Sequence, residues 1–356
     1  NTMVQGVINI PVAEDKVALR AVIYRYDNSG FIQNIVEDEP SALASAISFG
    51  GVAQNQDKVG GDQYDGLRLS ALWKPSENLK VVLTHTEQDI EQDGFPEVNG
   101  GLQGDFDQVR LRTGPEGRLK ESLENSIAVT NLKVDYVLDW GAFMSSSSWL
   151  DYDASSQTDW SHLITLPTYI GSEANTKSFI EEIRFSSTFK GDIQVLAGVY
   201  YEDYELNGSA PLAWSGDPLQ ETPIANSFPP SLAFDTLHTS QEYLIGTEQL
   251  AFFGELSYSL TEQLTATLGG RYFDYDQKDK FDGFGAFFGG TFGWDRESSD
   301  SGSTYKLNVS YTSDGDALIY GQWAEGFRLG EPGRSTPSFC DADQDGLVDG
   351  VGLASG

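Results

Sequence analysis

The sequence predicts an all-β fold, a transmembrane antiparallel up-and-down β-barrel, and three observations lead to that class. Apolar residues recur at every second position through most of the chain, whereas helical periodicity is nearly absent. Short connectors with turn chemistry alternate strictly with long polar tracts. Aromatic residues make up 12% of the chain and crowd the ends of the predicted strands. We expect about twelve strands of a larger barrel.

Strand by strand, the alternation defines two faces. The first predicted strand is VQGVINIPV, residues 4–12. In residues 65–75 the pattern places Leu67, Leu69, Ala71 and Trp73 toward lipid, with Arg68 and Ser70 toward the lumen. The same alternation predicts strands at residues 16–27, 130–140, 179–187 and 304–311, whereas the serine run SSSS weakens it within 142–152.

The connectors fall into two classes that a barrel would place at opposite ends. The short ones, most of which carry Pro, Gly, Asp or Ser, lie near 13–16, 75–78, 139–141, 190–192, 261–263 and 313–316. The long polar tracts span roughly 27–61, 89–125, 153–177, 205–246, 277–302 and 328 onward. Nothing in the architecture of a soluble sandwich requires short connectors at one end and long connectors at the other. An outer-membrane barrel has this arrangement, with short periplasmic turns and long extracellular loops.

Composition excludes several other classes. The formal net charge of −32, from 22 Lys+Arg and 54 Asp+Glu, argues against binding to nucleic acid. The aromatic content is too high for a disordered acidic chain. A mean hydropathy of −0.33 fits strands that are apolar on one face only. The single cysteine, Cys340, excludes an internal disulfide and leaves a partner outside this chain or a free thiol.

The two ends of the sequence suggest an internal piece of a longer protein. The chain starts within a strand pattern and finishes within a loop, without a basic leader segment. No run of 18 apolar residues is present, so the sequence predicts no transmembrane helix.

Several segments, in order along the chain, resemble a TonB-dependent outer-membrane receptor. They are GVINIPVAEDKVALRAVIYRYDNSGFIQN, RLSALWKPSENLKVVLTHT, EEIRFSS with LAGVYYEDYE, AFFGELSYSLTEQLTATLGGRYFDYD and ALIYGQWAEGFRLGEPG. The resemblance covers nearly all of residues 1–356 and implies a fragment of the β-barrel domain. In this family a 22-stranded barrel encloses a plug, so the plug domain and the C-terminal strands would be absent here.

The resemblance also implies a function. Such a receptor of the bacterial outer membrane imports a scarce nutrient, often a ferric siderophore, with energy from the TonB complex acting through the plug. Its partners would be TonB, an extracellular small-molecule ligand, and outer-membrane lipid with lipopolysaccharide. Import involves no covalent chemistry, so we expect no enzyme activity and no catalytic residues. Neither the substrate nor its contact residues follow from the sequence.

One acidic stretch suggests a metal site. DADQDG at 341–346 resembles the start of a calcium loop, with Asp341, Asp343 and Asp345 at alternate positions, Gly346 at the turn and Asp349 as a further ligand. The twelfth position is Gly352, so the closing bidentate carboxylate is missing. We therefore keep open both a weak extracellular calcium site and a solvated acidic loop. No other cofactor is indicated.

Other functional classes remain as alternatives. A passive porin or structural barrel would share these patterns and lack only the plug and the TonB-contacting segment. A barrel-type hydrolase would need a cluster at the extracellular rim, for which His162 near Asp159 and Asp151 is the nearest candidate. A secreted β-rich carbohydrate binder would not need lipid. The three histidines, His85, His162 and His238, show no metal-ligand spacing.

Overall fold

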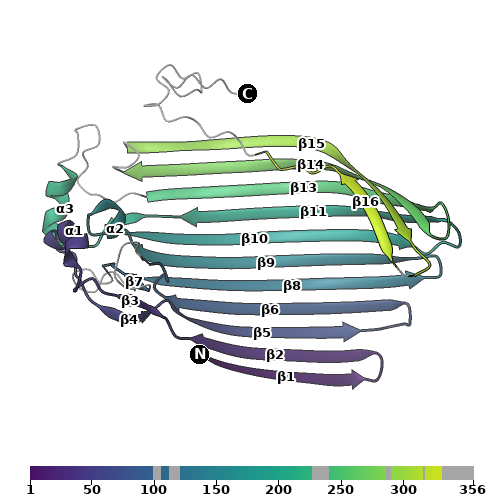
Figure 1. Cartoon of the computed structure of the whole chain (residues 1–356), viewed down its shortest axis with the longest axis horizontal. Helices are drawn as coiled ribbons and strands as arrows, with labels where there is room; N and C mark the ends of the chain where they lie inside the picture. Colours follow the sequence, from purple (N-terminus) through teal and green to yellow (C-terminus); the bar gives the residue numbers. More distant parts are fainter. Residues whose placement is uncertain (99–105, 112–120, 227–239, 286–289, 316, 331–356) are drawn as a thin grey trace, which may run out of the picture.

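A computed structural model shows one long antiparallel sheet whose strands follow one another in chain order (Figure 1). The structure describes residues 1–98, 106–111, 121–226, 240–285, 290–315 and 317–330. Within this part the sheet runs along twelve strands, and a short thirteenth strand pairs at its side. The prediction of about twelve antiparallel neighbours in chain order is confirmed.

The twelve strands of the main path are long, and most exceed the lengths that the sequence predicts. Their bounds are β1 Thr2–Ala13, β2 Val17–Asn28, β5 Gly61–Trp73, β6 Leu79–Asp93, β8 Ser122–Leu138, β9 Gly141–Asp159, β10 Thr168–Ser187, β11 Ile193–Ser209, β13 Ser240–Ser259, β14 Leu264–Gly285, β15 Gly290–Thr312 and β16 Leu318–Ala324. The side strand β12, Leu212–Trp214, pairs with β10.

The short connectors all lie at one end of the sheet, as predicted (Figure 1). The turn between β1 and β2 is closed by a hydrogen bond from Lys16 N to Ala13 O of 3.1 Å. It contains Asp15 at φ 57°, a left-handed conformation that Asp tolerates better than most residues. The long connectors gather at the opposite end.

The loop predicted at residues 277–302 is wrong, because strand pairing continues through nearly all of it. β14 extends to Gly285 and β15 starts at Gly290. The register places opposite charges directly across from each other, as in the pairs Lys278 with Glu297, Asp279 with Arg296 and Lys280 with Asp295. Such cross-strand pairs stabilise a polar ladder that carries no apolar signal in the sequence.

One face of the sheet, here called the outer face, is apolar over the half nearest the short turns. It carries Leu69, Trp73, Ile183, Leu268 and Leu307, whose exposures range from 45% to 60%. The predicted partition of Leu67, Leu69, Ala71 and Trp73 against Arg68 and Ser70 follows from the strand alternation of β5. These exposed apolar side chains have no protein cover, which fits a surface in contact with lipid.

Aromatic side chains mark both edges of this apolar zone. Near the short turns, Trp140, Phe143, Phe185 and Phe189 form a chain of ring contacts. Farther along the strands, Trp149, Phe179 and Tyr201 form a second chain. Trp140 and Trp149 are separated by about 30 Å of extended strand, or about 23 Å at a tilt of 40°. That height matches the apolar band of an outer-membrane barrel.

The opposite face, here called the inner face, is polar and more covered. It carries ion pairs between Lys133 and Asp135 at 3.2 Å and between Arg184 and Glu182 at 3.8 Å. On β13 and β14 it also carries a buried cluster of Ala251, Phe273 and Tyr275, with Tyr200 and Leu329 packed against it.

The long connectors fold into a small packed unit, here called the cap (Figure 1). It contains β3 Ile32–Asn34, η1 Pro40–Leu43, α1 Ala44–Ser48, β4 Gln56–Val59, β7 Asp107–Gln108, α2 Ser161–Ile164 and α3 Pro218–Ala225. Val36, Leu43, Ala46, Val109 and Leu111 form its buried core. These short elements were not foreseen, because each is too brief to show a periodic pattern. In the described part of the chain, the helices are all too short or too polar to cross a membrane.

The two-faced sheet generates a prediction about charge. Leu307→Arg in the full-length barrel places a cation on the outer face within the apolar zone, and we expect a cost of about 2–4 kcal/mol near the bilayer midplane. Val134→Arg should behave alike, since Val134 lies on the same face. The measurement is the free energy of folding into lipid vesicles.

The matched control is Asn308→Arg, one residue along β15 and on the inner face. It should cost less than about 1 kcal/mol, since a lumen substitution avoids hydrocarbon. Lys306 also lies on the inner face of β15, next to Leu307, but it is a poorer control. Its Nζ lies 2.5 Å from Glu255 Oε1, so replacing it would also remove an ion pair. Equal costs at Leu307 and Asn308 would contradict the assignment of the faces.

Candidate functional site

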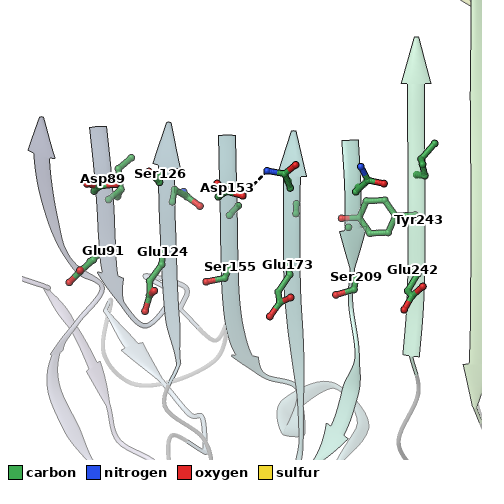
Figure 2. A pocket seen from close by; sticks show the side chains of 18 of the residues that line it. Asp89, Glu91, Glu124, Ser126, Asp153, Ser155, Glu173, Ser209, Glu242 and Tyr243 are labelled. Carbon is green, nitrogen blue, oxygen red and sulfur yellow. Dashed lines mark hydrogen bonds between the residues drawn. The ribbon is translucent and has the colours of Figure 1, made fainter. Parts of the chain in front are cut away.

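A groove of about 870 Å³ crosses eight strands near the cap (Figure 2). Two parallel rows of side chains line it. The register links Asp89, Ser126, Asp153 and Asn175 in one row, and Glu91, Glu124, Ser155 and Glu173 in the other. A ligand in this groove would meet mainly carboxylates.

The strand alternation assigns this groove to the outer face. On β10, Glu173 and Asn175 share the parity of Phe179 and Ile183, and on β9 Asp153 shares that of Trp149. The groove therefore lies on the same side as the apolar zone, about 20 Å of strand beyond the second aromatic chain. A cargo passing through the lumen would not contact it.

The groove carries a strongly negative charge. Eight carboxylates line it against a single lysine, Lys280, which pairs with Asp282 at 3.3 Å. Asn175 Nδ2 donates to Asp153 Oδ1 at 2.7 Å and so separates some of the like charges. No group of three or more potential metal ligands in the described residues has the geometry to hold an ion.

The inner face offers a different chemistry, concentrated on β11, β13 and β14. The Arg271 guanidinium lies 5.1 Å from the centroid of the Tyr200 ring, and its Nη2 donates to Gln249 Oε1 at 3.4 Å. Tyr200 Oη donates to Glu202 Oε2 at 2.9 Å. Cation, aromatic ring, amide and carboxylate thus meet within one patch that a lumen ligand would face.

A segment after β16 covers this patch. Residues 325–330, here called the strap, leave the sheet and cross the inner face, where Phe327 stacks on Phe273 at 3.8 Å between centroids. Gly330 N donates to Tyr275 Oη at 2.9 Å. The sequence motif GFRLG therefore marks the point where the chain turns from the wall into the interior.

The cap is held to the sheet by a buried ion cluster around Arg110. Its side chain is 1% exposed and pairs with Glu121 at 3.4 Å and with Glu97. Arg110 Nη1 also donates to the carbonyl of Asp159 at 3.1 Å. Asp159 in turn accepts from Leu111 N at 2.9 Å and from Ser161 N at 3.1 Å. These contacts tie Glu97, Glu121 and residues 110–111 to the end of β9.

The histidine at the rim does not form a hydrolytic cluster. Burial lowers the pKa of His162, and the nearby Arg110 charge lowers it further, so the imidazole is neutral at pH 7. The Asp159 oxygens accept from Leu111 and Ser161, while Asp151 lies eight residues back along β9. The patch around His162 therefore serves the packing of the cap.

The predicted calcium ligands Asp341, Asp343, Asp345 and Asp349 lie outside the described residues, as does Cys340. The calcium site thus stays a prediction. The sequence did not point to Arg110, Gln249 or Arg271. Arg271 could have been noticed as a cation in an alternating strand of a chain with few cations, whereas Arg110 sits in a polar tract without periodicity.

This arrangement defines a class of protein, a transmembrane β-barrel with an apolar outside, a polar inside and a folded cap at its mouth. The family described as TonB dependent receptor-like, beta-barrel matches residues 82–353, more than half of the chain. The chain therefore belongs to the TonB-dependent receptor family, as its resemblance implied, and it is a protein of the bacterial outer membrane. Members of this family are transporters rather than enzymes.

Solved structures agree on the fold. The ferric yersiniabactin uptake receptor FyuA from Yersinia pestis is 13% identical with a TM-score of 0.68, over 90% of this chain and 44% of that one. The ferripyoverdine receptor of Pseudomonas aeruginosa is 14% identical with a TM-score of 0.56, over 90% and 40%. The copper transporter OprC is 12% identical with a TM-score of 0.57, over 88% and 41%. No curated protein sequence matches the chain.

The buried cluster in the cap generates a second prediction. Arg110→Met keeps much of the side-chain volume but removes the guanidinium that pairs with the buried Glu121 carboxylate. Breaking a buried pair from one side costs about 3–5 kcal/mol. We expect amide hydrogen exchange at Leu111 and Asp159 to accelerate by roughly two to three orders of magnitude.

The control is Arg25→Met, which removes exposed contacts to Asp27 at 3.4 Å and Asp65 at 3.7 Å. Exposed ion pairs contribute about 0–1 kcal/mol, so exchange in the cap should not change. Unaltered protection of Leu111 in the Arg110 variant would show that apolar packing alone holds the cap.

Proposed function

We propose that the full-length protein imports a scarce nutrient across the outer membrane, with a ferric siderophore or a similar chelate as cargo and energy from the TonB complex. The observation that carries this proposal is the polar inner face beneath a folded cap, in a member of this receptor family. A purely structural barrel, which transports nothing, would not need a polar inner face with hydrogen-bond donors and acceptors gathered beneath a cap.

The chemistry of the inner face supports a small polar cargo. Arg271, Gln249, Tyr200 and Glu202 present both donors and acceptors on neighbouring strands. Two of the similar solved structures are themselves receptors for ferric chelates, one for ferric yersiniabactin and one for ferripyoverdine. At 13% and 14% sequence identity these structures support the same fold for this chain, but they do not indicate which chelate it binds.

The partners follow from the same proposal. TonB would act through a plug domain, and further strands would close the barrel, because this chain spans less than half of the three solved structures compared above. Outer-membrane lipid would contact the apolar outer face. Lipopolysaccharide would lie farther out, beside the acidic groove, where its phosphates would meet like charges.

The proposal predicts energy-dependent uptake. Iron-starved cells that carry the full-length receptor should accumulate ⁵⁵Fe from at least one of three chelate classes, catecholate, hydroxamate or carboxylate. The measurement compares cells with and without TonB, and cells with a collapsed proton gradient. We expect uptake to fall to the level of receptor-free cells in both cases.

A second assay separates the alternative of a passive porin or structural barrel. The receptor in planar lipid bilayers should show no steady ion conductance if a plug fills its lumen. Undiminished uptake without TonB, together with open-channel conductance, would overturn the proposal in favour of passive diffusion. Failure of all three chelates with a closed channel would exclude these ferric chelates as the cargo.

A further inference from the structure

Several inner-face side chains carry hydrogen-bond donors without a partner in the described residues, and two of them, on the neighbouring strands β13 and β14, contact each other. Gln249 on β13 is 5% exposed, and its amide Nε2 has no partner among the described residues. Arg271 on β14 likewise has a buried Nε without a partner in this part of the chain. A buried unmet donor costs about 1–3 kcal/mol, so such a pair needs an explanation.

The two donors belong to one constellation. Arg271 Nη2 donates to Gln249 Oε1 at 3.4 Å, which fixes the amide so that its nitrogen remains available. The guanidinium is held over the Tyr200 ring at 5.1 Å. An arginine stacked on an aromatic ring keeps its planar edge free for an acceptor with two oxygens.

Charge supports an anionic acceptor. The chain has 54 Asp+Glu against 22 Lys+Arg, yet no carboxylate in the described residues lies within 4.0 Å of Arg271. Glu202 lies nearby but already accepts from Tyr200, and Glu182 lies opposite Tyr200 on β10. Their negative charge limits the constellation to one anionic group rather than a highly charged cluster.

The strap forms one wall of this constellation. Leu329 packs on the cluster of Ala251, Phe273 and Tyr275, against which Tyr200 also packs. A ligand that reaches Arg271 would contact the strap or shift it.

We propose that Gln249 and Arg271 form a recognition point for one anionic oxygen group of the cargo, a carboxylate or a phenolate, with Tyr200 beneath and the strap beside it. This inference rests on the proposed import function, because it assigns a ligand class to the inner wall. It places recognition on β11, β13 and β14 rather than in the acidic groove of the outer face.

The test uses the purified full-length receptor and two isosteric probes, 4-fluorobenzoate and 4-fluorobenzamide, observed by ¹⁹F NMR. We expect benzoate to bind in the millimolar range and benzamide to bind at least tenfold more weakly, because only benzoate presents two charged oxygens. Arg271→Gln and Gln249→Glu should each lower benzoate affinity at least tenfold, whereas Arg271→Lys should give an intermediate value because it keeps the charge and loses the fork.

The matched control is Lys133→Gln, which removes a cation from the same face on β8 and should leave benzoate binding unchanged. Folding of each variant is checked by its unfolding temperature. Equal binding of the two probes, no binding of benzoate by the wild type, or unchanged affinity in Arg271→Gln would each overturn the inference. The binding assay needs neither TonB nor transport, so it tests this site independently of the proposed import. Binding of benzoate could be confirmed although uptake proves independent of TonB, and uptake could depend on TonB although benzoate does not bind.

Discussion

The backbone hydrogen-bond ladder of the long antiparallel sheet is the constraint on which every other feature depends. Once neighbouring strands are in register, each residue belongs to one of two faces, and a shift by one residue would exchange them. The same register that turns Leu69 outward also turns Arg271 inward. Membrane contact, cargo recognition and the attachment of the cap are therefore consequences of one pairing pattern rather than separate designs.

The sequence predicted the fold class and the faces well, because period-two alternation is strong wherever one face is apolar. It failed where both faces are polar. Residues 277–302 pair as strands through their backbones, with opposite charges such as Lys278 and Glu297 in register, and this polar pattern looks like a loop when only hydrophobicity is considered. The cap was missed for the opposite reason, since its core comes from residues scattered over several connectors, such as Val36 and Leu111.

Knowledge of the register also changes which surface is relevant to transport. The acidic groove is a large hollow of about 870 Å³, yet Glu173 shares the face of Phe179 and Ile183. Size alone would have directed attention to the outside of the barrel. Residue type alone could not have separated the two surfaces, because the carboxylates of the groove and the polar residues of the lumen are of similar type. They differ in parity along the strand, which can be followed only once strands are known to continue through these polar segments.

Two arginines, Arg110 in the cap and Arg271 on the inner face, show how the same side chain can have different roles. Arg110 is paired with two carboxylates, Glu97 and Glu121, and donates to a backbone carbonyl, so it holds loops together. Arg271 has an aromatic ring and one amide oxygen as neighbours, and part of its hydrogen-bonding capacity is unused. Five of the eight arginines in the described residues have no described carboxylate within 4.0 Å, so a missing counter-ion does not by itself single out Arg271. What distinguishes Arg271 is the combination of a stacked aromatic ring with a buried Nε and a neighbouring Gln249 Nε2 that both lack a partner among the described residues. Because buried donors without an acceptor are unfavourable, this combination is explained by an anion that arrives from outside the chain.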